Sequence, residues 1–414
     1  VEVGSGKALS GQLGILGGGV GITGYNRVRD AMLDHARWES RSTLAYANEQ
    51  GRVMHAVESL FPRGSGSLEE SLDGFWNGWS DLADHPTDAG VRFALRGRAD
   101  ALVAKFHSLD QGLDRLKQEA SLTLGERVTE ANQLLDQVGS LNVQIAHSVY
   151  AKNPDLGAMD QRDLSLQRLA ELLPARFEEQ SDGSTSVYLR GLQVVQVGHV
   201  TNLNLDKSGP DPQLTIGDAA LAFPTGLDSG EIGALLGPVI DGIGTTRSNL
   251  NSLVSTLVAQ VNAVHSAGYG ADGSTGNDFF DAAGTTASSV DLSSDIDDPQ
   301  AIAGSSSATA AGDNANALAL HDIRYANVMS GGSQTMADNV VDIVSEVGAS
   351  VVAARARALG AESTVAGLDA LAEGVSKVSI DDEMVTLIKL QQAYAASARV
   401  LSTSEEMFDL LLSI

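Results

Sequence analysis

The sequence predicts a mainly α-helical fold with an inserted β domain. Both chain ends form an elongated helical bundle or rod, and the middle forms a small antiparallel β domain. The nine prolines leave residues 87–153 and everything after 299 free of proline, and an interior proline costs a helix about 3 kcal/mol. In those stretches apolar residues recur three and four positions apart, as in a helix, whereas residues 176–221 alternate with a period of two.

Residues 1–172 are expected to form the N-terminal part of the helical rod, with helices over 26–60, 67–84 and most of 87–153. The last of these, at about 55 residues, would be about 80 Å long. Gly125 is its weak point, because glycine costs a helix about 1 kcal/mol relative to alanine, and the helix can kink or split there. Its apolar stripe consists of Val91, Leu95, Ala99, Leu102, Phe106, Leu109, Leu113, Leu116, Leu124, Val128, Ala131, Leu134, Val138, Leu141 and Ile145.

Residues 173–230 are expected to form the β-rich inserted domain, because alternating strands are separated there by turn residues such as Ser181-Asp182-Gly183-Ser184. A helix over 231–267 then returns to the rod or packs on the β domain. Residues 268–312 are rich in glycine, serine, alanine and aspartate. We expect them to form a loop-rich acidic segment that lies with the β domain.

The chain returns to helix, with residues 313–379 in the rod and residues 380–414 as an amphipathic assembly helix. In the last helix a stripe repeats at alternating spacings of four and three, interrupted by polar Gln391 and Glu405, which is a heptad pattern. An ordinary intramolecular bundle helix is the alternative. The stripe continues to the end, where chains usually fray, and this favours an assembly contact. The expected interface consists of Ile380, Met384, Leu387, Tyr394, Ala398, Leu401, Phe408 and Leu412.

Composition argues against several classes of partner. The 414 residues include 27 Lys and Arg against 53 Asp and Glu, a net charge of −26. Nucleic acids and anionic membrane surfaces would repel such a chain, and no uncharged apolar run approaches the roughly 18–20 residues of a membrane span. The chain has no cysteine, which removes disulfides, thiol nucleophiles and Cys-ligated metals. We therefore expect neither nucleic-acid nor membrane partners.

The motifs that could carry chemistry are weak, and we expect no catalytic, cofactor-binding or metal-binding residues. Gly19 to Gly24 matches G-x-G-x-x-G but lacks the preceding buried strand of a dinucleotide site, so a flexible connection is favoured.

Asp160 and Asp163 are better explained as a helix start tied by ion pairs than as an acid–base pair. Residues 272–281 lack the order of a calcium loop, although weak surface cation binding is an alternative to a plain turn. No histidines have zinc-site spacing, and His265 is expected to pack or cap near a helix end.

Several stretches resemble the flagellar axial proteins of bacteria. The segment from Asp382 to Val400, with its Gln391-Gln392-Ala393-Tyr394-Ala395-Ala396-Ser397-Ala398 core, resembles the C-terminal signature shared by hook, rod and hook-associated proteins. Three further stretches are similar to the hook-associated protein 1 family, in that family's order. They are Gly21 to Asp30; Leu141 to Ile145 followed by Asn153, Pro154, Asp155, Leu156, Met159, Asp160, Gln161, Arg162 and Asp163; and Val261 to Tyr269 with Phe279 and Phe280.

The resemblance implies a non-enzymatic structural subunit of the flagellum, secreted through the flagellar type III export apparatus, that joins hook to filament outside the cell. The implied partners are further copies of the chain in a ring or tube, the hook protein, hook-associated protein 3 and an export chaperone, with no cofactor. The family begins with a helical segment and an N-T-P-G-Y turn that nothing here matches. We therefore expect the C-terminal stripe to depend on a neighbouring molecule.

Two alternatives remain at this point. The chain could be another axial protein, such as hook-associated protein 3 or a flagellin, although those usually lack the stretch from Asn153 to Asp163. A secreted acidic enzyme acting on glycans, using carboxylates of residues 272–298, belongs to a different class. Such an enzyme needs a cleft with two carboxylates roughly 5–10 Å apart.

Overall fold

The computed structural model of the chain describes residues 2–5, 9–11, 14–16, 20–24, 30–209, 211–217, 228–310, 312–376 and 380–413. These residues form two compact units. Trp38–Ser363 form the helical unit, and Val1–Arg37 with Thr364–Ile414 form the terminal unit. Among the described residues, no helix combines the length and the apolar character that a membrane span requires.

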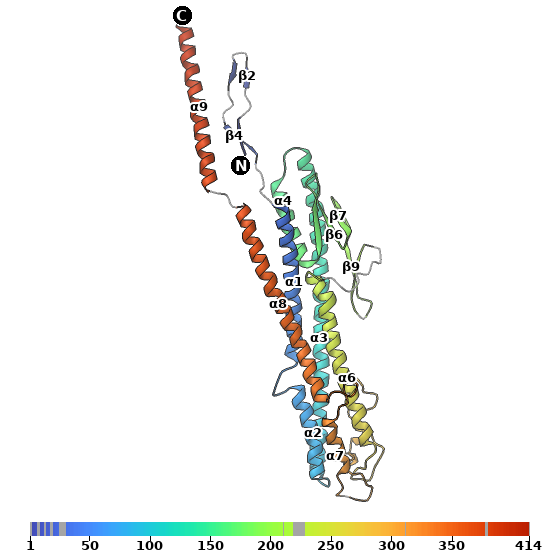
Figure 1. Ribbon diagram of the computed structural model, residues 1–414. Coiled ribbons are helices and arrows are strands. Elements are labelled where there is room, and N and C mark those ends of the chain that lie inside the picture. Colours follow the sequence, from blue (N-terminus) through green and yellow to red (C-terminus); the bar gives the residue numbers. More distant parts are fainter. Residues whose placement is uncertain are drawn as a thin grey trace. The chain divides into compact units, whose positions relative to one another are not determined.

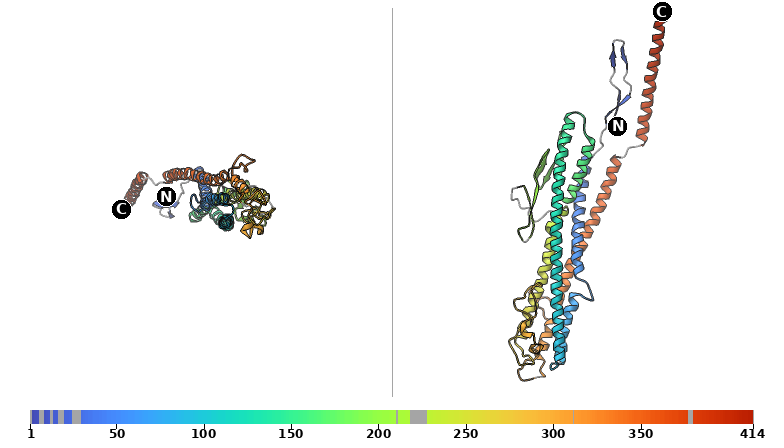
Figure 2. Two further views of the ribbon diagram at one scale, coloured as in Figure 1. Left: turned by 90° about the horizontal axis from the view of Figure 1, so that it is seen from below. Right: turned by 180° about the vertical axis from the view of Figure 1, so that it is seen from behind.

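Long helices make up most of the helical unit, as the sequence predicts, and the mainly α-helical fold class with a β insertion is confirmed (Figure 1). Helix α3 runs the length of this unit, with α1, α6 and α8 beside it and α2 and α7 at one end (Figures 1 and 2). The boundary between the units falls inside α1 and α8. The helices are α1 (Ala31–Leu60), α2 (Leu68–Asp84), α3 (Ala89–Tyr150), α4 (Leu156–Leu172), α5 (Glu231–Ala234), α6 (Ile240–His265), α7 (Ala315–Asp322) and α8 (Met336–Ser376).

Helix α3 continues unbroken through Gly125 for 62 residues. Leu124 and Val128 are both buried on either side of this glycine, and their packing outweighs the roughly 1 kcal/mol that glycine costs. The Lys207 ammonium lies over the same turn and donates a hydrogen bond to the Ser121 carbonyl at 3.0 Å. The helix therefore neither kinks nor splits at its weakest residue. A π-helical turn at Leu235–Val239, which contains Pro238, joins α5 to α6.

The inserted β structure lies along the half of α3 that leads into α4 (Figure 1). It comprises a four-stranded antiparallel sheet, ordered β5-β6-β7-β8, and a separate β9–β10 hairpin. Val187 in β6 is paired with Phe177 in β5 and with Val195 in β7, and all three side chains are buried against the helices. The strands are β5 (Ala175–Glu179), β6 (Thr185–Leu189), β7 (Leu192–Gln196), β8 (His199–Val200), β9 (Leu203–Asp206) and β10 (Gln213–Ile216).

Residues 268–312 do not lie with the β domain, contrary to the expectation from sequence. Phe279 and Phe280, both fully buried, pack against Phe75 of α2 with ring centroids 5.7 and 5.8 Å away. The segment also contacts the first third of α3, where Arg96 forms an ion pair with Asp297 at 2.9 Å. The two phenylalanines decide the placement, because the aromatic cluster of α2 offers them an apolar site at this end of the unit.

The terminal unit contains strands as well as helix. Strand β1 (Glu2–Ser5) pairs with β4 (Val20–Gly24), and β2 (Leu9–Gly11) pairs with β3 (Gly14–Leu16), all antiparallel. The prediction of helical rod for all of 1–172 therefore fails for these residues. Within the G-x-G-x-x-G match, Gly19 lies outside the described residues and the rest is β4, so the match is neither a flexible connection nor a loop that opens a helix. Helix α9 (Ile380–Leu412) forms the C-terminal part of this unit.

Candidate functional site

The face of α9 predicted for assembly is exposed along its described length. Met384 and Leu387 are each 54% exposed, Tyr394 is 75% exposed and Leu412 is 82% exposed. Ala398, Leu401 and Phe408 continue the same exposed face. Ile380 lies in the first turn of α9, but its side chain is outside the described residues. A solvated helix face this apolar is typical of a segment that is covered in an assembly.

The stretch from Asn153 to Asp163, by contrast, is used within the helical unit. Asn153 and Pro154 end the turn after α3, and the backbone N–H of Asp155 donates to the Ser148 hydroxyl at 2.9 Å. Asp155 caps α4, because its carboxylate accepts from the Ala158 N–H at 3.0 Å and from the Gln144 amide at 2.7 Å. These hydrogen bonds lower the pKa of Asp155.

Arg162 ties α4 to the first turn of the β sheet. Its guanidinium is buried, donates to the carbonyl of Gly183 at 2.5 Å and forms an ion pair with Asp163 at 3.0 Å. Gly183 has a φ of 80°, which glycine adopts without strain, and a β-carbon there would lie 3.1 Å from Ile145. Leu156 is half-buried at the start of α4, whereas Asp160 and Gln161 are exposed. The motif therefore holds α3, α4 and the sheet together. The ion pair expected at the helix start is that between Arg162 and Asp163, but the sequence did not predict the bond from Arg162 to the sheet.

Two asparagines on α3 fasten the β strands to the helix. Asn142 accepts from the backbone N–H of Thr185 at 2.9 Å and donates to the carbonyl of the same residue at 2.8 Å. Asn132 makes the same pair of bonds with Leu203, at 2.8 and 2.9 Å. An asparagine side chain has the donor and acceptor arrangement of a peptide group. Each side chain therefore forms hydrogen bonds with the N–H and carbonyl at a strand edge, which would otherwise be buried without partners. We call these side chains backbone clasps.

A third backbone clasp holds the loop after α6, and His265 lies beside it. The Asn262 amide donates to the carbonyl of Phe280 at 2.8 Å and accepts from the N–H groups of Phe279 and Phe280. His265 is fully buried, with Nδ1 2.7 Å from the Asn277 carbonyl, and Nε2 accepts from the Ala303 N–H at 2.9 Å. Burial lowers the pKa of His265 to about 4, so the ring is neutral, with its proton on Nδ1. The prediction that His265 packs near a helix end agrees with this position.

A dense group of ionisable side chains lies between α3, α4 and α5. Arg168 forms ion pairs with Glu130 and Glu231 at 2.7 Å and with Glu171 at 2.9 Å. The hydrogen bonds from Arg168 hold the pKa of Glu130 below its ordinary value. A catalytic acid or base needs a pKa near the working pH, whereas Glu130 is kept anionic. The group fastens three helices to one another, and Glu130 is unsuited to acid–base chemistry.

Several of the aspartates in residues 272–298, considered above for glycan chemistry, accept hydrogen bonds from nearby backbone N–H groups or form an ion pair. Asp272 accepts from the Ser274 N–H at 2.9 Å, Asp281 from that of Ala283 at 3.0 Å, and Asp298 from that of Gln300 at 3.0 Å. Asp297 is paired with Arg96. Asp272, Asp281 and Asp298 therefore stabilise their own turns, and Asp297 fastens the segment to α3. Among the described parts of the chain, no group of three or more histidine, aspartate or glutamate side chains has the spacing to hold a metal ion.

Comparisons with known proteins agree with the motifs. Residues 54–280 match the model of the flagellar hook-associated protein FlgK helical domain, and residues 374–414 match that of the flagellar basal body rod FlgEFG protein C-terminal segment. Flagellar hook-associated protein 1 of Bacillus subtilis is 25% identical over 97% of this chain and 87% of its own length. Its Salmonella typhimurium counterpart is 25% identical, over 97% and 91%. The structure of the flagellar hook junction protein FlgK from Burkholderia pseudomallei is similar in fold, with a TM-score of 0.69 and 14% identity, over 84% of this chain and 100% of that one.

Proposed function

The chain belongs to the family of the flagellar hook-associated protein FlgK and is a structural component of the bacterial flagellum, not an enzyme; from this premise we propose that it joins the hook to the filament outside the cell. Its task is mechanical. The helical unit supplies a stiff body, because its polar motif residues are bonded internally. The exposed face of α9 supplies adhesion to neighbouring molecules.

The exposure of the α9 face is the observation that carries this proposal. Leu387, Leu401 and Phe408 lie on one apolar stripe of the helix, which would normally be buried, yet each is more than half exposed. Burying a leucine or phenylalanine side chain fully contributes about 1.5–3 kcal/mol. A row of such side chains therefore stabilises a contact with a second helix strongly, and we expect this face of α9 to be buried only in the assembly.

The proposed partners follow from the place of the family in the flagellum. Copies of this chain form a ring or tube, the hook protein lies on one side of it, and hook-associated protein 3 lies on the other. An export chaperone would cover apolar segments such as α9 before passage through the type III apparatus. The absence of cysteine suits export of an unfolded chain, because no disulfide can form and trap it.

Electron microscopy of cells that lack the gene tests the junction role. We expect hooks without filaments, and filament protein released into the medium, because nothing joins the two structures. Complementation with the unchanged gene should restore filaments. Filaments retained on the deleted cells would refute the junction role.

Substitution on α9 tests the assembly face in the same cells. Leu401→Asp is expected to reduce the number of filaments at least tenfold, since the carboxylate must lose water in a helix–helix contact. Thr403→Asp is the matched control, because it places the same charge two residues away, about 200° around the helix. Both side chains are exposed in the isolated chain, so neither change should affect folding. Equal loss of filaments with both variants would contradict the assignment of this face.

A further inference from the structure

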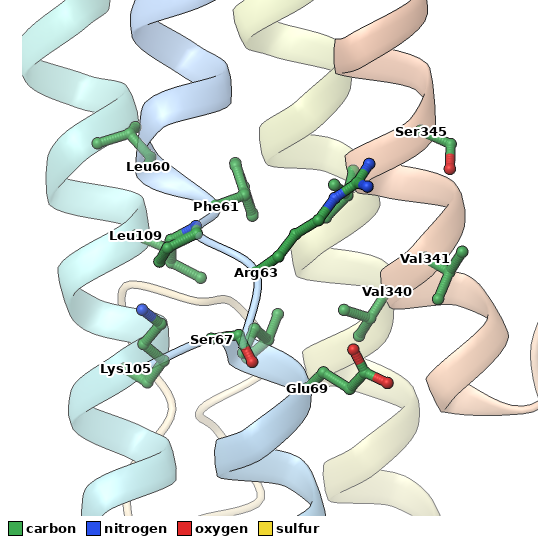
Figure 3. A pocket seen from close by; sticks show the side chains of 13 residues that line it. Leu60, Phe61, Arg63, Ser67, Glu69, Lys105, Leu109, Val340, Val341 and Ser345 are labelled. Carbon is green, nitrogen blue, oxygen red and sulfur yellow. The ribbon is translucent and has the colours of Figure 1, made fainter. Parts of the chain in front are cut away.

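A cavity of about 380 Å³ opens on the helical unit where the loop between α1 and α2 meets α3 and α8. Phe61, Leu109, Val340 and Val344 provide its apolar walls. Figure 3 shows Arg63 extending from the loop towards α8, with Lys105 on the opposite side. The cavity thus combines apolar walls with two cationic side chains and one carboxylate, that of Glu69.

Arg63 is the unusual member of this lining. Lys105 donates to the carbonyl of Gly66 at 2.6 Å, but Arg63 makes no hydrogen bond or ion pair with any residue the structure describes. An unpaired guanidinium is uncommon in a chain with nearly twice as many acidic as basic residues. An aromatic ring with a carboxylate nearby would fit this cavity. The ring would contact the apolar walls and attract the guanidinium through a cation–π interaction, and the carboxylate would form an ion pair with Arg63.

The surface of α8 beside the cavity is also apolar. Val341 lines the cavity and is 51% exposed, and Val352 and Leu359 are exposed further along the helix. At about 100° per residue, these three side chains project within about 20° of one another. They form a sparse apolar row, with side chains about 16 and 10 Å apart along the axis, which starts at the cavity; we call it the α8 strip.

The opposite side of the unit presents a matching side chain. Phe93 of α3 is 61% exposed, whereas every other phenylalanine described in residues 38–363 is buried. Asp100, two turns further on, projects within about 20° of Phe93. It is exposed and forms no ion pair with another described residue. The cavity residues Lys105 and Leu109 lie about 120° and 160° around α3 from Phe93.

We propose that Phe93 of one copy enters this cavity in the next copy, with Asp100 paired to Arg63, and that the α8 strip lies against α3 of the incoming copy. This inference rests on the proposed function, since it names the lateral contact of the same assembly. Because the protruding Phe93 and the cavity lie on opposite sides of one molecule, the contact between copies is head-to-tail. Such a contact produces rings or tubes, whereas two identical faces would stop at a dimer.

Cysteine cross-linking tests the contact in assembled flagella, since the chain has no cysteine of its own. The test variant is Gly97→Cys with Ser345→Cys, which leaves Phe93 in place. A β-carbon at Gly97 meets nothing within 4 Å, and Ser345 lines the cavity. Flagella isolated from cells that carry only this variant are treated with a short bismaleimide. We expect a ladder of products at two, three and more chain masses, because each copy offers both sites.

The control is Thr129→Cys with Ser345→Cys, which places the thiol on the same face of α3 but about 48 Å further along the helix. It should give at least fivefold less ladder, and Phe93→Ala added to the test variant should reduce its ladder at least fivefold. Filamented flagella that contain the protein but give no ladder above the control overturn the lateral contact alone. Products with another flagellar protein overturn the choice of a second copy. Normal filaments without the protein overturn the proposed function itself.

Discussion

The loop after α6 and the face of α9 carry two motifs of the same family, yet they use their side chains in opposite ways. In the loop, Asn262 and His265 satisfy buried backbone groups, and Phe279 lies in a closed aromatic cluster. On α9 the motif leaves Met384 and Tyr394 in solvent. The first motif is complete within one molecule, whereas the second is incomplete until another molecule covers it. Folding and assembly therefore depend on different residues of one chain.

Truncation of one apolar residue in each region gives the largest expected difference. Phe279→Ala should lower the free energy of unfolding by about 3–5 kcal/mol, because it opens a cavity beside Phe75 and Trp79. Leu401→Ala should change it by less than about 0.5 kcal/mol, since this side chain is already solvated. Urea unfolding followed by tryptophan fluorescence measures both, because Trp79 lies 5.2 Å from Phe279. Similar losses in the two variants would remove the distinction between the regions.

The backbone clasps can be tested separately from apolar packing. Asn142→Ala should cost about 2–3 kcal/mol, because it leaves the buried N–H and carbonyl of Thr185 without their side-chain partner. Asn204→Ala is the matched control, because its amide is exposed and donates a single hydrogen bond to Gly217. The same urea titration compares them. A cost below about 0.5 kcal/mol for Asn142→Ala would show that water replaces the clasp.

The pH dependence of stability is the smallest effect and reports on His265. Its pKa is about 4 in the folded chain against about 6.5 when unfolded. The unfolded chain therefore binds the extra proton as the pH falls below 6.5. From pH 8 to pH 5.5 this residue alone should lower the free energy of unfolding by roughly 1–2 kcal/mol. Nearby Asp295 and Arg92 act on the ring with opposite signs. Urea titrations of the unchanged chain and of His265→Gln at both pH values check this. The difference in unfolding free energy between the two pH values should be smaller in the variant by the contribution of His265.

Much of the fold could be read from local patterns. Proline-free periodic stretches predicted α3 and α8, and alternation with Asp182-Gly183 predicted the β5–β6 hairpin. The heptad stripe of α9 was visible because a helix projects such residues on one side whatever surrounds it. The placement of residues 268–312 was missed, because neither loop composition nor charge indicates where two phenylalanines will find an apolar site. Strands β1 to β4 were missed because short glycine-rich runs carry little periodic signal.

The sequence by itself determined the long helices, the β insertion and the family, since periodicity and short motifs are local properties of the chain. Only the tertiary structure decided what the polar motif residues do. Asn142, Arg162 and Asn262 form hydrogen bonds with backbone groups between 17 and 55 positions away. Every residue type offers the same backbone carbonyl, so the sequence does not show which residue accepts such a bond. The cavity at Arg63 likewise exists only where α3 and α8 meet, because it is a gap in packing between segments more than 200 residues apart.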